Sequence, residues 1–285
     1  MPHIALRCRE IADADLEGVT DLLTFGFRAE RDRAFWQRAL DRLGRHATPP
    51  GYPRFGYVLD SGGALVGVLL QIFTQAGPAA PVRCNMSSWW VMPAFRVYGP
   101  MLVSRALRHD ATYTNITPAR HTWKILEAQG YLPYCRGWVM ALAWLSRDAE
   151  PARVVAFDDG TAPDEHLTAR DIALLRDHAA YGCICVTCEA GGRRYPFVFA
   201  PRRRYGVVGI ALPTYCSEGA EPRRFAGALG RYLARRGYVM MYLDADGPLP
   251  GITGVYNSRR PKFYKGPNRP RVGDYAYSER AMFGS

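Results

Sequence analysis

Residues 87 to 103 read SSWWVMPAFRVYGPMLV, and this stretch decides the fold. Its aromatic and β-branched start predicts a strand that ends at Pro93, because proline cannot donate to a strand ladder. Its last residues predict a helix that begins near Met101, with Pro100 at the first helical position, where a missing N–H is tolerated. The residues between strand and helix form a tight connection.

This connection has the features of an anion site. The N–H groups at the start of a helix lack intrahelical partners, and the helix dipole is positive there. Gly99 would let the backbone approach a ligand closely, and the guanidinium of Arg96 suits a phosphate. We therefore expect a pyrophosphate group to bind at this connection.

The same segment resembles the pyrophosphate loop of the GNAT superfamily of acyl-CoA-dependent acyltransferases, whose pattern is strand-Pro-x-x-Arg-x-x-Gly-x-Gly/Ala-helix. Pro93, Arg96 and Gly99 match this pattern, whereas Met101 stands where a second small residue is usual. Farther along, Asn115 and a helix that ends in a Gly-Tyr pair resemble the strand and helix that follow in the family. The resemblance covers residues 5–144 well and the second half loosely.

The resemblance implies an α/β fold with a central, mostly antiparallel mixed sheet flanked by helices. Two parallel strands, here 82–92 and 112–116, would splay apart to admit the pantetheine arm of acetyl-CoA or a longer acyl-CoA. The implied activity is transfer of the acyl group to an amine, with backbone N–H groups near Val91 polarising the thioester carbonyl. The implied cofactor-binding residues are Val91, Met92, Arg96, Val97, Tyr98, Gly99, Met101 and Asn115.

The sequence departs from the family at its usual catalytic positions. Leu126 stands where many members have a tyrosine that acts as general acid for the leaving thiolate. Asn85, Ser87 and Ser88 occupy the strand where many members carry a glutamate base. His109 and His121 are candidate bases, although solvent exposure is the simpler expectation for each. The catalytic residues therefore remain unassigned.

The two halves of the chain echo one another. The expected order in the first half is β-α-α-β-β-β-α-β-α-β, closing with a strand at 138–144. The second half repeats a glycine-pair hairpin, a strand with a proline near its end, a helix and a strand. We expect a GNAT-like half at 1–146, a linker at 147–165, and a degenerate GNAT-like half with a basic C-terminal segment at 166–285. Its stretch equivalent to the loop, 212–219, carries an acidic residue at the wrong place for a phosphate.

Composition places the chain among globular proteins. It has 285 residues, 48% of them hydrophobic and 22% charged, and no apolar run approaches the ~20 residues of a membrane span. We see no signal-peptide pattern at the start and expect a cytoplasmic protein with seven reduced cysteines. The formal net charge of +11 favours anionic partners, such as nucleotide phosphates, an acidic acceptor, RNA or an anionic membrane surface.

A cysteine cluster raises the question of metal binding. Cys183, Cys185 and Cys188, with His178 nearby, offer four zinc ligands, but the spacing is irregular and buried cysteine is the commoner state. Cys84 lies on the strand expected to face the cofactor, yet no partner base is close to it in sequence. We predict no metal site.

Two other functions fit the same sequence. Tandem GNAT-like folds also resemble aminoacyltransferases that use charged tRNA, and the basic composition suits such a substrate. The missing acid and base are equally compatible with a non-catalytic module that only binds acyl-CoA. In the tail, 256–265 mixes aromatic and basic residues and is a candidate contact for a phosphate-bearing acceptor.

Overall fold

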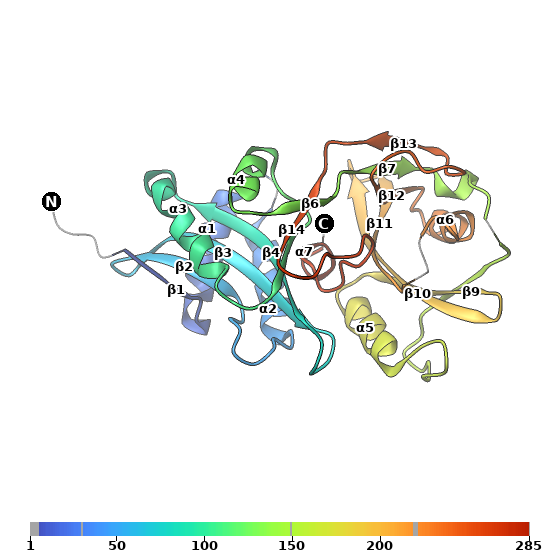
Figure 1. Ribbon diagram of the computed structural model, residues 1–285, viewed down its shortest axis with the longest axis horizontal. Helices are drawn as coiled ribbons and strands as arrows, with labels where there is room; N and C mark the ends of the chain where they lie inside the picture. The colour runs from blue at the N-terminus through green and yellow to red at the C-terminus, as the bar shows by residue number, and fades with distance from the viewer. Residues whose placement is uncertain (1–5, 30, 149, 219–221, 285) are drawn as a thin grey trace. The chain divides into compact units, whose positions relative to one another are not determined.

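The computed structural model describes residues 6–29, 31–148, 150–218 and 222–284 (Figure 1). The chain divides into two compact units. The first comprises Met1–Asn115 and Tyr264–Arg269, and the second comprises Ile116–Phe263 and Pro270–Ser285. In the part of the chain that the structure describes, no helix is both long enough and apolar enough to span a bilayer.

The first unit is built on a mixed sheet. Its strands follow the order β1-β2-β3-β4-β5, and β14 continues this order beside β5. From β1 to β4 the neighbours are antiparallel, whereas β4 and β5 are parallel. The elements are β1 (Leu6–Glu10), α1 (Leu16–Gly26), α2 (Arg33–Arg45), β2 (Gly56–Ser61), β3 (Ala64–Gln75), β4 (Val82–Val91), α3 (Gly99–Ala106), β5 (Thr112–Asn115) and β14 (Lys262–Lys265), of which Tyr264 and Lys265 belong to this unit.

Helices cover both faces of this sheet. Every residue of β3 from Val66 to Phe73 is buried, and since successive side chains point to opposite faces, both faces must be covered. Two neighbouring tryptophans on β4 point to opposite faces of the sheet, and each contacts a different helix. Trp89 lies under the first residue of α3, Gly99. Trp90 meets Phe25 of α1 edge-on, with ring centroids 5.5 Å apart.

The second unit holds another mixed sheet, in the order β13-β7-β12-β11-β10-β9-β8. Its neighbouring strands are antiparallel except β11 and β12, which are parallel. The elements are α4 (Trp123–Ala128), β6 (Leu132–Cys135), β7 (Gly137–Ala141), β8 (Arg153–Ala156), α5 (Ala169–Ala180), β9 (Ile184–Ala190), β10 (Arg193–Arg204), β11 (Val208–Cys216), α6 (Ala226–Ala234), β12 (Met240–Ala245), β13 (Gly254–Asn257) and α7 (Glu279–Met282).

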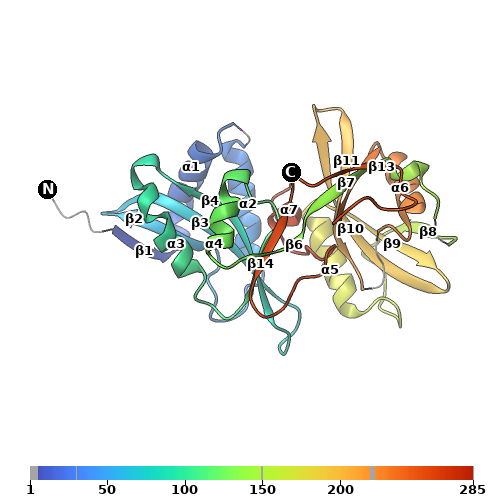
Figure 2. The same cartoon turned by 45° about the horizontal axis from the view of Figure 1, so that its top comes forward.

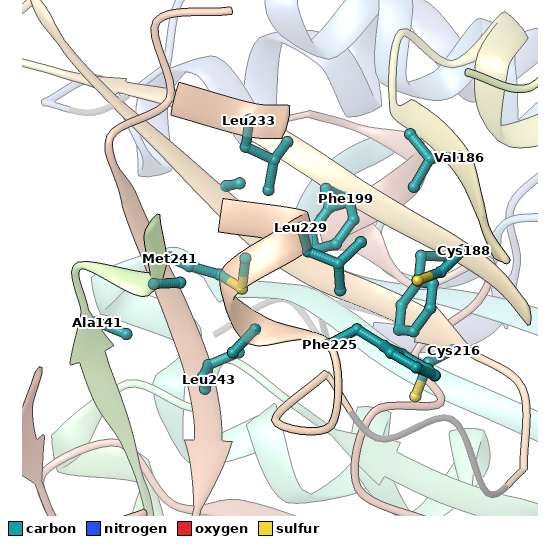
Figure 3. Packing of buried hydrophobic residues seen from close by; sticks show 14 of the residues in the cluster. Ala141, Val186, Cys188, Phe199, Cys216, Phe225, Leu229, Leu233, Met241 and Leu243 are labelled. Atoms are coloured by element: carbon teal, nitrogen blue, oxygen red, sulfur yellow. The ribbon is translucent and has the colours of Figure 1, made fainter. Parts of the chain in front are cut away.

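The core of the second unit lies between this sheet and α6 (Figure 3). Alternate residues of the strands point at the helix, as Met241 and Leu243 of β12 do, and Leu229 and Leu233 of α6 fill the space above them. Phe199 of β10 is fully buried in the same cluster. Apolar residues that recur every two positions in the strands and about every 3.6 positions in the helix therefore pack in one core.

Three features differ from the sequence expectations. The strand expected to close the first half at 138–144 is β7, which lies between β13 and β12 in the second sheet. The segment expected to be a linker, 147–165, contains β8, the edge strand of that sheet. Residues 274–283, whose two tyrosines and apolar end suggest a strand, instead form one bridge, Asp274 with Tyr215, and the short helix α7. Which sheet a strand joins depends on long-range pairing, which local patterns do not encode. The domain boundaries at 146 and 165 remain predictions.

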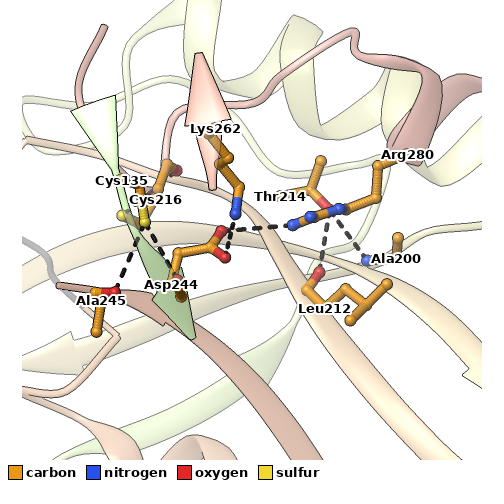
Figure 4. A network of polar contacts seen from close by, with 11 residues as sticks. Cys135, Ala200, Leu212, Thr214, Cys216, Asp244, Ala245, Lys262 and Arg280 are labelled. Carbon is orange, nitrogen blue, oxygen red and sulfur yellow. Dashed lines mark hydrogen bonds and ion pairs between the residues drawn. The ribbon is translucent and has the colours of Figure 1, made fainter. Parts of the chain in front are cut away.

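A buried charge cluster ties three segments of the second unit together (Figure 4). Asp244 of β12 binds Lys262, and Arg280 of α7 lies 3.5 Å from its other carboxylate oxygen. The side chains of Lys262 and Asp244 are only 2% and 8% exposed. Burial raises the pKa of Asp244, but the charges of Lys262 and Arg280 outweigh this effect and hold it below its usual value. Asp244 therefore lies as a buried anion between two cations.

Replacing Asp244 by Asn should destabilise the protein by about 3–5 kcal/mol at pH 7, because two buried cations lose their counter-charge. The measure is urea denaturation. A group with a lowered folded-state pKa stabilises the fold above its unfolded value of about 3.9, and this stabilisation is lost as the pH falls through the folded pKa. The difference in the free energy of unfolding between wild type and variant should therefore decrease below about pH 4. Exposed Asp158→Asn is the control, and equal stability of D244N and wild type at pH 7 would contradict the cluster's role.

Candidate functional site

The site expected from the sequence lies where β4 and β5 part. The two strands pair only at Arg83, Cys84 and Asn85, whereas β4 continues to Val91. A β-bulge follows this paired region, since Leu69 and Gln71 of β3 pair with Trp89 and Met86 of β4. A bulge bends its strand and increases its twist. The splayed parallel strands expected from the sequence are thus present.

Two backbone N–H groups of β4 point to the edge that β5 leaves open. The N–H of Met92 donates to the carbonyl of Val66 on β3 at 2.9 Å. Because N–H groups alternate sides along a strand, those of Trp89 and Val91 point away from β3. Within the described residues of the first unit, no strand lies beside β4 at this point. These donors are available to an extended ligand.

The connection after β4 is more ordered than the expected open loop. Residues Pro93–Tyr98 form a 3-10 helix, and α3 starts at Gly99, two residues before the expected start. The N–H of Phe95 donates to the carbonyl of Met92 at 2.8 Å, and that of Gly99 donates to the carbonyl of Arg96. A 3-10 turn at a helix start uses such donors internally. Fewer N–H groups therefore face a ligand than the sequence suggested.

Gly99 packs closely on a tryptophan beneath the loop. Its φ of −52° is an ordinary helical value. A Cβ built on it would lie 3.2 Å from Cζ2 of Trp89 and 3.9 Å from a methyl of Val91. The absent side chain thus lets α3 rest on Trp89; close approach of the backbone to a ligand at Gly99 remains a prediction.

The remaining predicted cofactor residues lie at one edge of the first sheet. Arg96 is exposed, and its side chain makes no hydrogen bond or ion pair within the described residues. Val97 is 78% exposed, and Tyr98 and Met101 are exposed beside it. Asn115 is half-buried at the end of β5. Since the carboxyl ends of parallel strands share an edge, this end of β5 and the loop after β4 face the same side.

The other reactive candidates of the first unit do not join this edge. Cys84 is fully buried against Gln71, whose Nε2 lies 3.3 Å from its Sγ, and burial raises the pKa of its thiol. His109 follows the far end of α3, and its Nε2 lies 2.7 Å from the hydroxyl of Tyr57. It is half-buried rather than exposed, and burial lowers its pKa. We assign neither residue a role in the site.

The positions of the family's usual acid and base offer no ionisable group. Asn85 is buried and Ser87 and Ser88 are half-buried on β4. Leu126 is 6% exposed on α4 of the second unit. The Gly-Tyr pair after it closes that helix as expected, because Gly130 has a φ of 81° and the N–H of Tyr131 donates to the carbonyl of Leu126 at 3.0 Å.

The cysteine cluster of the second unit is part of a packed core. His178 uses both ring nitrogens, because Nδ1 lies 2.7 Å from the carbonyl of Leu174 and Nε2 accepts from the N–H of Tyr277. Burial raises the pKa of Cys188 to about 12 and also raises that of Cys185. No group of three or more potential metal ligands occurs in the residues that the structure describes.

The second unit has a similar divergence of parallel strands, but its own chain fills it. β11 and β12 pair at Ile210 and Ala211. Beyond this point the N–H of Tyr275 donates to the carbonyl of Thr214 at 2.7 Å, and the N–H of Cys216 donates to that of Gly273 at 3.1 Å. The edge that is open in the first unit is thus covered, and Tyr275 is buried there. Sequence reasoning missed this contact, which joins residues about sixty positions apart.

Comparison with known proteins gives structural matches only. No family model matches the chain, and no curated protein does. The glucosamine N-acetyltransferase region of a fungal multi-domain β-N-acetylglucosaminidase is 12% identical, with a TM-score of 0.59 over 93% of this chain; the chain spans 38% of that protein. A putative acetyltransferase from Pyrococcus horikoshii is 11% identical, with a TM-score of 0.55 over 99% of this chain and 97% of that one.

A GCN5-related N-acetyltransferase from Anabaena variabilis is 10% identical, with a TM-score of 0.55 over 97% of this chain and 75% of that one. The chain has the GNAT fold. Because these matches extend along nearly its full length, the tandem arrangement of two GNAT-like halves expected from the sequence is confirmed. At these identities the likeness concerns the fold.

Replacing Gly99 by Val should destabilise this GNAT fold by about 1–3 kcal/mol, since the new methyl groups meet Trp89 and Val91 in a packed site. Gly99→Ala should cost less. Thermal unfolding measures both. Gly77→Val is the matched control, because a Cβ at Gly77 meets no atom within 4 Å. If Gly99→Val has the same melting temperature as wild type, a glycine at position 99 is not needed for this packing.

Proposed function

We propose that this protein is an acyltransferase that moves an acyl group from acyl-CoA to an amine, and that the first unit binds the donor. The observation that carries the proposal is the open edge of β4. There the N–H groups of Trp89 and Val91 face away from β3 at the place where β5 has ended. The second unit covers its own equivalent edge, so one donor per chain is expected.

The donor would lie along β4 with its phosphates at the following loop. The carbonyl groups of the pantetheine arm would accept from Trp89 and Val91, as in strand addition. Arg96 would pair with the pyrophosphate, since it has no carboxylate partner within the described residues. Met92, Val97, Tyr98, Gly99, Met101 and Asn115 would complete the binding edge. The length of the acyl chain, acetyl or longer, is left open by these contacts.

Acyl-CoA supplies an activated thioester. The protein would supply a backbone N–H that hydrogen-bonds the thioester carbonyl and a binding site for the amine. The N–H of Val91 can stabilise negative charge on the thioester oxygen as the new C–N bond forms. A thiol has a pKa of about 8.5, so the C–S bond can break without an acid, in keeping with a leucine at 126. A lysine-like amine, with a pKa of about 10.4, must lose a proton, and water near β4 is the proposed acceptor of it.

The acceptor is proposed to be an amine with an anionic group, because the net charge of +11 favours such a substrate. All seven cysteines are free thiols, which suits a reducing compartment, and we place the protein in the cytoplasm. A second function, acyl-CoA binding without catalysis, is favoured by the uncharged residues Asn85, Ser87 and Ser88 on β4. Transfer from charged tRNA would need a different donor and would not require CoA.

The test is calorimetric binding of CoA and acetyl-CoA to the full chain. Arg96→Gln should weaken binding about 10- to 100-fold, the effect of losing a charge-assisted hydrogen bond, without changing the melting temperature. Arg108→Gln, on an exposed arginine beyond the far end of α3, is the control. Release of free thiol from acetyl-CoA with a panel of amines separates an enzyme from a binding module. Absence of CoA binding by wild type would refute both the acyltransferase proposal and the proposal of a binding module.

A further inference from the structure

The hairpin of β10 and β11 extends from the second sheet as a two-stranded ribbon (Figure 2). β9 accompanies β10 only as far as Phe199, and β12 joins β11 only from Ile210. Between these points, at Arg202, Arg203 and Arg204, β10 pairs with β11 alone. Both edges of this ribbon are therefore free of further strands at Arg203 and Arg204.

The tip of the ribbon displays an aromatic ring at a backbone position that disfavours it. Tyr205 has a φ of 54° and Gly206 a φ of 73°, the pair of positive angles found in type I′ turns, where Asn or Gly is usual at the first position. Tyr205 is 81% exposed and Val207 is 74% exposed. Neither side chain contributes to the core. A strained, exposed aromatic residue points to a role outside folding.

Arginines without a carboxylate partner surround this tip, although Arg204 hydrogen-bonds the hydroxyl of Tyr205 and Arg236 the carbonyl of Tyr232. Arg202, Arg203 and Arg204 are exposed on the ribbon, and Arg235 and Arg236 follow α6 at the same end of the sheet. The two segments touch, since a Cβ on Gly209 would lie 1.9 Å from the carbonyl oxygen of Gly237. Among the described residues, none of these five arginines pairs with a carboxylate. Other arginines of the unit do so: Arg176, Arg194, Arg224, Arg231 and Arg280.

The sequence keeps acidic residues away from this surface. No Asp or Glu occurs between Glu189 and Glu218, which covers the whole ribbon, or between Glu221 and Asp244, which covers α6. Aromatic rings accompany the arginines. The guanidinium of Arg204 lies 5.0 Å from the ring centroid of Tyr205. The surface therefore combines uncompensated positive charge with a ring open for stacking.

We propose that this surface, made of residues 202–207 and 235–236, binds single-stranded nucleic acid. Phosphates would pair with the arginines, and an unpaired base would stack on Tyr205, the combination that single-strand binding proteins use. Strand alternation places Arg203 on one face of the ribbon and Arg202 and Arg204 on the other. A flexible single strand of nucleic acid can contact both faces of the ribbon. A flat membrane surface can contact only one face, and a duplex offers no unpaired base for Tyr205. The proposal does not depend on the acyltransferase function.

The test uses the full chain and fluorescein-labelled 20-nucleotide RNA and DNA of mixed sequence, with binding followed by anisotropy between 50 and 200 mM salt. Tyr205→Asn should weaken binding about 5- to 150-fold, the range for one stacked base. Its melting temperature should stay equal or rise, because Asn tolerates a positive φ. Tyr205→Phe should retain binding. The RNA and DNA arms show which sugar is preferred.

The double variant Arg203→Gln with Arg204→Gln should weaken binding and reduce the steepness of the salt dependence by about 1.4 in log–log slope, since each single-strand phosphate contact contributes about 0.7. The matched control, Arg153→Gln with Arg193→Gln, removes the same charge from the starts of β8 and β10, and it should leave both the affinity and the salt dependence unchanged. Three outcomes would overturn the proposal: no binding at 50 mM salt, equal loss in both double variants, or hairpin-dependent binding only to phosphatidylglycerol vesicles.

Discussion

The parting of β4 from β5 after Asn85 is the constraint on which the proposed site depends. A parallel pair that continued to Val91 would use every backbone donor of β4 within the sheet. The bulge at Ser87 and Ser88 bends β4, and the short β5 ends at Asn115. Two donors are then left at an edge, and the packing of Gly99 on Trp89 fixes the loop and helix that follow. The site is thus a consequence of strand geometry.

The two halves use the same geometry differently. In the second unit, β11 and β12 also separate after two paired residues, yet residues 273–275 hydrogen-bond to the free edge. Burial of Tyr275 and the charge cluster of Asp244, Lys262 and Arg280 hold this tail segment in place. A strand edge must be paired with protein, ligand or water. The second half satisfies its edge with its own chain, which leaves only the first half open to a donor.

Much of this could be predicted from local sequence. Glycine pairs such as Gly62-Gly63 fixed the hairpins, and Pro93, Arg96 and Gly99 indicated the loop and the GNAT fold. What escaped prediction rests on contacts between distant residues. The sheet that β7 joins depends on its pairing with β12, a hundred residues on. The packing of α3 on Trp89 at Gly99 was not anticipated, and the filling of the β11 edge requires residues 273–275 of the tail.

Amide hydrogen exchange followed by NMR, on the full chain with and without CoA, tests the central claim most directly. Without CoA, the amides of Trp89 and Val91 should exchange faster than those of Trp90 and Met92, which point toward β3. Saturating CoA should slow Trp89 and Val91 while leaving Thr214 and Cys216 of β11 unchanged. Slowing confined to β11, or no change at Trp89 and Val91 despite bound CoA, would contradict the account.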